Sequence, residues 1–177
     1  RGLLGSGEPD VGARPRRVRT SCWGLTGTPL LSSETRITEL AALCAGTYVT
    51  GGAAHWRMME RADVFVQNLR PGATDRLGFG AEAVLARNPR LVYCSISGFG
   101  ETGPYAGKRV YDPLIQAMSG FADRQGEGVE PKMIRTVIAD KATAVYAAQA
   151  VTAALFHRER TGEGQHVRVA MLDVMLS

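Results

Sequence analysis

The sequence predicts an α/β fold built on a parallel sheet, and three consecutive segments carry that prediction. Residues 62–68, ADVFVQN, are apolar and β-branched, as expected of a buried strand, and residues 91–97, LVYCSIS, form a second such run. Between them, residues 71–89 contain a turn and then a helical pattern that stops at Asn88, before a proline. Two short strands separated by one helix indicate a parallel pair joined by a right-handed crossover.

The elements after the second strand continue this alternation. Residues 98–108, GFGETGPYAGK, are too rich in glycine for regular structure and predict a loop, and ligand-binding loops commonly lie at strand ends. Residues 111–122, YDPLIQAMSGFA, resume as a helix with proline in the first turn. The clearest helical pattern runs over residues 139–160, and the alternating residues 165–173, QHVRVAMLD, predict a strand.

The first 60 residues have a different character from the rest of the chain. Residues 1–20 are rich in Gly, Pro and Arg without apolar periodicity, which predicts loop or disorder, and residues 33–46 predict a short helix. Four arginines between residues 14 and 19 form a basic run, but without interleaved aromatic residues we favour a solvated tail over a nucleic-acid site. We therefore expect an atypical, partly disordered segment over residues 1–60 and a core over residues 61–177.

Composition and residue spacing argue against several classes of protein. A chain of 177 residues with 45% hydrophobic content can bury one sizeable core, and it contains neither a membrane-spanning apolar run nor a secretory signal, so we predict a cytoplasmic protein. Its three cysteines and three scattered histidines lack metal-ligand spacing, so we expect no metal site and expect the histidines to be structural or superficial. The net charge of +4 fits a phosphate-bearing partner as well as a nucleic acid.

Asp140 is the candidate catalytic residue. It lies at the start of the predicted helix over residues 139–160, where free backbone N–H groups and the helix dipole stabilise an anion, so we expect it to be ionised at neutral pH. A carboxylate so placed can attack a thioester carbonyl as a nucleophile. Aspartate is also a preferred helix cap, so position alone favours a capping role.

A family resemblance favours the catalytic role of Asp140 over the capping role. The segments ADVFVQNLRPG, NPRLVYCSISGFGETGPYA with YDPLIQAMSG, and ADKATAVYAAQAVTAALFHRERTGEGQHVRVAMLD follow one another between Ala62 and Asp173. Together they resemble the core of a family III CoA-transferase, the CaiB/BaiF group that includes formyl-CoA and carnitine CoA-transferases. The resemblance implies a Rossmann-like parallel-sheet large domain, coenzyme A as substrate, and Asp140 as the nucleophile. It implies transfer of CoA between an acyl-CoA and a carboxylic acid through an aspartyl acyl-anhydride and an aspartyl-CoA thioester.

The resemblance also implies where the coenzyme lies. In the family an N-F/L-R-P-G element and an arginine shortly after it contact the coenzyme, and arginine suits this role because it makes bidentate contacts with phosphate. The glycine loop over residues 98–104 is expected near the thioester, where backbone N–H groups can donate to a developing oxyanion. The predicted coenzyme contacts are Asn68, Leu69, Arg70, Ala73, Arg76, Gly98, Lys108, Arg109 and Tyr111.

Two other functions remain open at this point. Racemases of the same fold look like G-H-D-I-N-Y where this chain has V-Y-D-P-L-I, and Tyr111 in place of that histidine is a poor proton donor near neutral pH, which favours transfer over racemisation. A non-catalytic CoA-binding fragment is the second alternative. The resemblance covers residues 60–177, so we expect a partial chain whose first 60 residues come from a shifted or unrelated frame, and a homodimer when the protein is intact.

Overall fold

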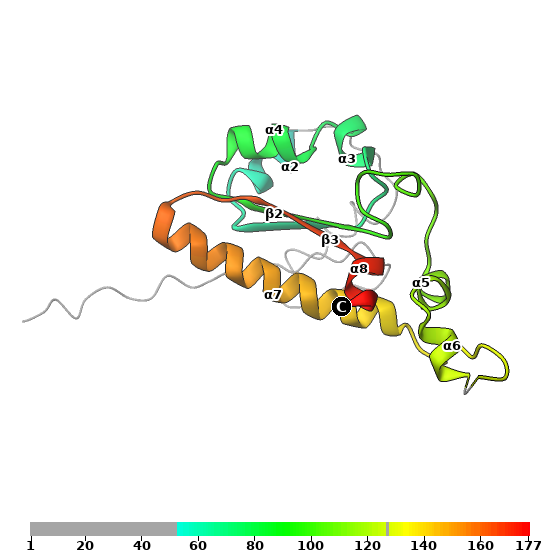
Figure 1. Cartoon of the computed structure of the whole chain (residues 1–177). Coiled ribbons are helices and arrows are strands. Elements are labelled where there is room, and N and C mark those ends of the chain that lie inside the picture. The colour runs from blue at the N-terminus through cyan, green and yellow to red at the C-terminus, as the bar shows by residue number, and fades with distance from the viewer. Residues whose placement is uncertain (1–52, 127) are drawn as a thin grey trace, which may run out of the picture.

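A computed structural model describes residues 53–126 and 128–177, so the helix predicted over residues 33–46 lies outside the described part. Three parallel strands form one sheet in the order β1 (Val64–Gln67), β2 (Val92–Ser97) and β3 (His166–Ala170). Helices lie on both faces of this sheet (Figure 1). The predicted α/β class with a parallel crossover is confirmed.

Three short helices cover one face of the sheet, which we call the α4 face. They are α2 (Ala53–Met59), α3 (Ala73–Arg76) and α4 (Ala81–Arg87). Aromatic and aliphatic side chains from both layers form a core there, with Phe65 between Phe79 and Tyr93 at ring distances of 6.1 and 5.0 Å. The region from 71 to 89 holds two helices where the sequence predicted one, because Gly78 has a φ of 84° and breaks the helical path.

The opposite face, which we call the α7 face, packs against α7 (Ile138–Thr161). The predicted helix over residues 139–160 is confirmed and extends one residue further at each end. Cys94 on β2, Val169 on β3 and Ala147 on α7 form the buried centre of this layer. Alanine at the contact lets the helix lie close to the strands, so α7 is held along its length by apolar packing.

The carboxyl end of the sheet carries the remaining helices, α5 (Asp112–Met118), α6 (Phe121–Gln125) and α8 (Met171–Leu176). Ile115, Ala139 and Met171 join α5, α7 and α8 in a third buried cluster. Two predictions are corrected here. The single helix expected over residues 111–122 is interrupted at Gly120, which has a φ of 76°, and the strand expected over residues 165–173 ends at Ala170, where α8 begins.

Candidate active site

The predicted site residues lie beyond the carboxyl ends of the strands. Figure 1 shows β1 leading to α3, β2 leading to the long loop before α5, and β3 leading to α8, all at one end of the sheet. The start of α7 approaches the same end from the opposite face. Ligands of open parallel sheets bind at this edge, so the fold concentrates the candidate residues where a site is expected.

Asp140 occupies the first turn of α7, as predicted. The capping position belongs to Val137, and no side chain of the helix caps its own N-terminus. Instead the backbone N–H of Asp140 donates to Oδ2 of Asp112 on α5, at 2.9 Å. The capping role that position alone favoured for Asp140 is therefore wrong: its backbone is capped from another helix, and its exposed carboxylate is left available.

The residues that support Asp140 form a buried polar clamp between α5 and the segment entering α7. Asp112 is 4% exposed and Gln116 is 1% exposed, and the Gln116 amide donates to Oδ1 of Asp112 at 2.6 Å. The same amide donates to the Thr136 carbonyl at 3.3 Å, while its oxygen accepts from the N–H of Ile134 at 2.9 Å. These bonds fix the chain immediately before and at the start of α7, which sets the position of Asp140.

The environment of Asp140 makes its negative charge less favourable. Partial desolvation by neighbouring protein atoms raises the pKa of the Asp140 carboxyl, and the Asp112 carboxylate raises it further. Desolvation and a like charge thus act against the helix dipole, and ionisation of Asp140 at neutral pH stays a prediction. A carboxylate with a raised pKa is a better nucleophile than an ordinary one, because basicity and nucleophilicity rise together.

The N-L-R-P-G element forms a turn between β1 and α3. Gly72 adopts a left-handed conformation with a φ of 73°, and the Arg76 guanidinium lies so close that a side chain at Gly72 would contact it at 3.3 Å. Ala73 begins α3 with its N–H bonded to the Arg70 carbonyl at 2.9 Å. The side chains of Asn68, Arg70 and Arg76 are exposed, so two guanidiniums and an amide are available to a ligand.

The glycine loop follows β2 and is tied down at its base. A side chain at Gly98 would collide with Val110, and the Gly98 carbonyl accepts from the N–H of Leu172 at 3.0 Å, so close packing requires glycine at this position. Further along, Lys108 lies over the Tyr105 ring at 4.6 Å. Arg109 is exposed, and Tyr111 is 73% exposed with no role in the core.

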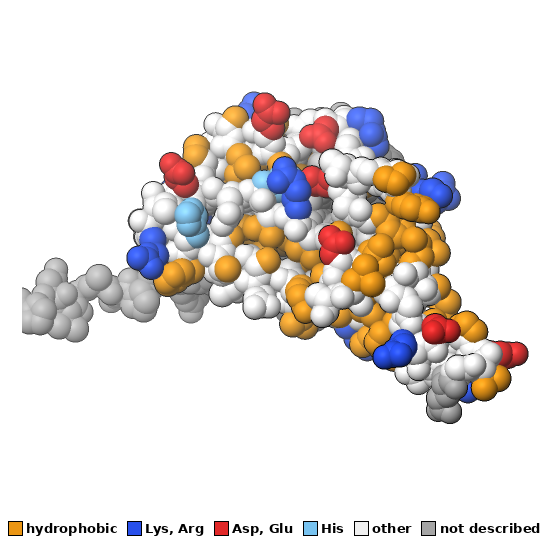
Figure 2. All heavy atoms as spheres, in the orientation of Figure 1, with side chains coloured by type: hydrophobic (Ala, Val, Ile, Leu, Met, Phe, Trp, Pro, Cys, Tyr) orange, Lys and Arg blue, Asp and Glu red, His pale blue; other side chains and the backbone are white. Residues whose placement is uncertain are grey.

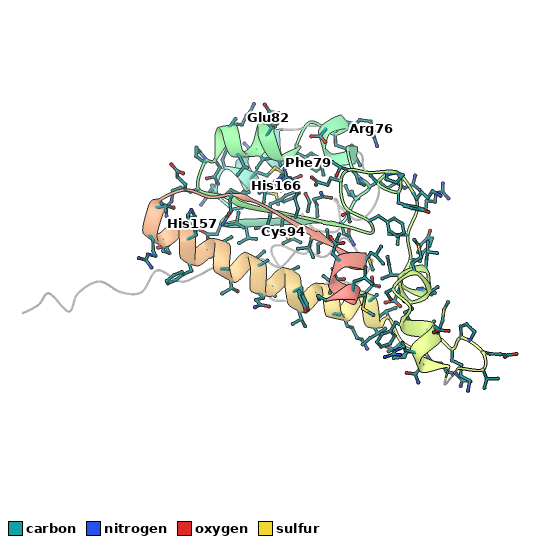
Figure 3. The ribbon with its side chains drawn as sticks, viewed as in Figure 1. Arg76, Phe79, Glu82, Cys94, His157 and His166 are labelled. Carbon is teal, nitrogen blue, oxygen red and sulfur yellow. The ribbon has the colours of Figure 1, made fainter. Side chains whose placement is uncertain are left out.

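A chain of polar side chains on the α4 face links these two predicted coenzyme segments, and sequence reasoning missed it. The Leu69 N–H donates to Gln67 at 2.8 Å, the Gln67 amide donates to Ser95 at 3.0 Å, and the Ser95 hydroxyl lies 2.7 Å from Nε2 of His166. Figure 3 shows His166 on the same side of the sheet as Phe79. These contacts agree with the structural role expected of His166.

The far end of this chain reaches the glycine loop. Nε2 of His166 lies 3.7 Å from the Glu101 carboxylate, which also accepts from the Arg168 guanidinium at 2.7 Å. A sequence signal existed, because Gln67, Ser95 and His166 are polar residues within strands that are rich in apolar residues. Only the strand register, with Gln67 opposite Ser95 and Tyr93 opposite His166, brings them together.

The structure thus connects some of the predicted site residues to neighbouring elements and leaves others exposed. Polar contacts through Gln67, Ser95 and His166 lead from Leu69 to the glycine loop, and a hydrogen bond joins Asp140 to α5. Lys108, Arg109 and Tyr111 are exposed before α5. Within residues 53–126 and 128–177, no three His, Cys, Asp or Glu side chains gather as metal ligands. Over the same residues, no helix has the length and apolar character needed to cross a membrane.

Comparisons with known proteins identify what this arrangement resembles. The family model for "CoA-transferase family III" matches residues 48–177. The chain is 43% identical over 119 residues to a succinate–glutarate CoA-transferase of Agrobacterium fabrum, covering 67% of this chain and 30% of that protein. It is also 43% identical over 122 residues to an acetyl-CoA:oxalate CoA-transferase of Acetobacter aceti, covering 68% of this chain and 31% of that protein.

Solved structures agree with the sequence relatives. A CaiB/BaiF family protein from Brucella suis superposes with a TM-score of 0.66 at 43% identity, covering 69% of this chain and 32% of that one. A hypothetical protein from Mycobacterium tuberculosis superposes with a TM-score of 0.64 at 36% identity, covering 69% and 35% respectively. The chain therefore spans about a third of the length of the relatives it matches.

Proposed function

The chain belongs to CoA-transferase family III, and from that premise we propose that it takes part in moving coenzyme A between an acyl-CoA and a carboxylic acid, with Asp140 as nucleophile. The observation that supports this most is the position of Asp140: an exposed carboxylate at a helix start, held by the buried Asp112 and made more basic by its surroundings. Because the chain spans only part of its relatives, the activity of the whole protein is part of the proposal.

The proposed reaction begins with attack of the Asp140 carboxylate on the thioester carbonyl. A C–O bond forms, the C–S bond breaks, and coenzyme A leaves as a thiolate, which produces an acyl-aspartyl anhydride. The thiolate then attacks the aspartyl carbonyl, releasing the donor acid as its carboxylate and leaving an aspartyl-CoA thioester. The acceptor carboxylate repeats the two steps in reverse order, so that a new acyl-CoA leaves and the Asp140 carboxylate is regenerated without a redox change.

The remaining predicted residues hold the coenzyme in this proposal. Arg70 and Arg76 present guanidiniums on either side of the Gly72 turn, where phosphate groups can receive bidentate hydrogen bonds. Asn68 supplies an exposed amide beside them. Lys108, Arg109 and Tyr111 lie on the loop before α5, and we assign them to the outer part of the coenzyme or to the acyl group.

A transfer assay tests the proposal. The chain is incubated with acetyl-CoA and oxalate, or with succinyl-CoA and glutarate, and new acyl-CoA species are followed by mass spectrometry. Transfer that disappears in Asp140→Ala and persists in Asp173→Ala, an exposed acid in the first turn of α8, supports it. Incorporation of deuterium at the α-carbon of a branched acyl-CoA in heavy water, without transfer, would instead indicate a racemase.

We also propose that the protein acts as a homodimer. Figure 2 shows hydrophobic side chains gathered over α5 and α8, where a partner could cover them. The exposed large hydrophobic residues of α5, α7 and α8 include Leu114, Met118, Val145, Tyr146, Phe156 and Leu176. Light scattering should give twice the chain mass, and Leu114→Glu with Met118→Glu should lower that mass; a monomer in the parent chain would contradict the assignment.

A further inference from the structure

We propose that His166 is a positioning residue that couples the coenzyme turn over residues 68–76 to the glycine loop over residues 98–104. This inference rests on the proposed function, because that function places coenzyme contacts on both segments. The two segments follow different strands and are separate in the chain, so each could adopt its position independently. His166, on the third strand, lies where a single side chain can influence both.

The first observation is an unbroken path of contacts. It runs from the Leu69 backbone through Gln67 and Ser95 to His166, with successive distances of 2.8, 3.0 and 2.7 Å. From His166 the path continues to Glu101 at 3.7 Å. Gln67 is 6% exposed and Ser95 is 3% exposed, so little water competes for these bonds. A displacement at one end is therefore transmitted to the other.

The second observation is that each link of this path can pair a donor with an acceptor. The Leu69 N–H donates to the oxygen of Gln67, so the Gln67 amide presents its N–H to Ser95. The Ser95 oxygen accepts this N–H, and its second lone pair can accept from the Nε2–H of His166. The neutral imidazole with its proton on Nε2 supplies this bond, and the same N–H faces the Glu101 carboxylate.

The surrounding charges favour that neutral form. Burial lowers the pKa of His166, and the neighbouring Arg168 guanidinium lowers it further. The carboxylates of Glu101 and of Asp75 on α3 act in the opposite direction but more weakly. The Tyr93 ring packs edge-on against the imidazole at 5.1 Å and holds its orientation. The neutral imidazole therefore carries the coupling near neutral pH.

The test compares three histidine variants in the full chain. His166→Leu removes the imidazole N–H, whereas His166→Gln keeps an amide N–H near the position of Nε2 and cannot be protonated. His157→Gln, on the exposed surface of α7, is the matched control. We expect His166→Leu to raise the Kd for coenzyme A about 5–10-fold by calorimetry at pH 7.5, a loss on the order of 1–1.4 kcal/mol. His166→Gln should recover most of that loss, and His157→Gln should change nothing.

A further measurement separates this inference from the proposed function. Hydrogen exchange of the unliganded chain should quicken in His166→Leu over both residues 68–76 and residues 98–104. A chain that binds no coenzyme A defeats the proposed function, and the exchange data still decide the coupling. Faster exchange in the glycine loop alone, or equal affinity in parent and His166→Leu chains, would overturn it.

Discussion

The two ends of α7 are built in opposite ways. At its carboxyl end the helix finishes with basic residues in the last turn and a left-handed Gly162 cap with a φ of 82°, both of which stabilise a helix end. At its amino end there is no side-chain cap of its own, and Asp140 is an acid whose pKa its surroundings raise. The carboxyl end therefore carries features that stabilise a helix end, whereas the amino end, where the site lies, lacks a side-chain cap and carries an unfavourable charge.

Arg158 shows how the carboxyl end is secured. Its side chain is 11% exposed and reaches between the starts of β1 and β2. It pairs with the Asp63 carboxylate at 3.0 Å and donates to the carbonyls of Asp63 and Arg90 at 3.4 and 3.3 Å. The end of the helix is thereby attached to two strands. Stability is concentrated here, and the opposite end can carry a less favourable charge without unfolding.

The largest loss of stability is expected when Arg158 is removed. Arg158→Met should lower the free energy of unfolding by about 2–3 kcal/mol, because two carbonyls and a carboxylate lose a buried donor. Urea denaturation at pH 7 measures the effect. Arg160→Met, in the same turn but exposed, should change the free energy of unfolding by less than about 0.5 kcal/mol. Equal losses in the two variants would contradict the conclusion that the buried contacts of Arg158 stabilise the carboxyl end of α7.

An intermediate effect is expected at the clamp that holds the amino end. Asp112→Ala removes the acceptor of the Asp140 N–H and one of the two acceptors of the Gln116 amide, and it should cost about 1–2 kcal/mol of stability. It should also slow acylation of Asp140 about 10–100-fold, because a small displacement of a nucleophile strongly affects its rate.

The charge of Asp112 is separable from its hydrogen bonds. Asp112→Asn keeps one acceptor oxygen but removes the carboxylate that raises the pKa of Asp140. The acid limb of the acylation rate against pH should therefore move to lower pH in this variant. An unchanged acid limb would show that the two carboxyl groups do not interact.

The smallest expected effect is a gain in stability. Because the pKa of Asp140 is higher in the folded than in the unfolded chain, its ionisation destabilises the fold once the pH rises through the folded pKa. Asp140→Asn should raise the melting temperature by about 1–2 °C at pH 7, a modest amount because the side chain is exposed. The gain should vanish below the pKa of Asp140 in the unfolded chain. A lower melting temperature of the variant at pH 7 would contradict the conclusion that the charge of Asp140 destabilises the fold.

Local sequence patterns predicted the elements better than their connections. The strands around Phe65 and Cys94 and the long helix containing Asp140 appear close to their predicted bounds, because each is a continuous apolar or amphipathic run. The breaks at Gly78 and Gly120 were missed, because a glycine inside a helical pattern becomes a break only when the surrounding packing requires a positive φ.

The sequence likewise predicted only part of the candidate site. Asp140 was found because its segment resembles a family and because a helix start can be recognised from neighbouring residues alone. The support from Asp112, and the path through Ser95 and His166, depend on contacts between residues 28 and 71 positions apart. No periodicity in a single sequence encodes such contacts, since they arise from strand register and helix packing.

The most direct test of this account is the fate of Asp140 itself. The chain is mixed with acetyl-CoA or succinyl-CoA, quenched with hydroxylamine, and digested, and the residue converted to a hydroxamate is identified by mass spectrometry. We expect the modification at Asp140, its absence in Asp140→Asn, and its retention in Asp173→Asn. A folded parent chain that binds coenzyme A yet is modified at another residue, or not at all, would contradict the assignment of Asp140 as the nucleophile.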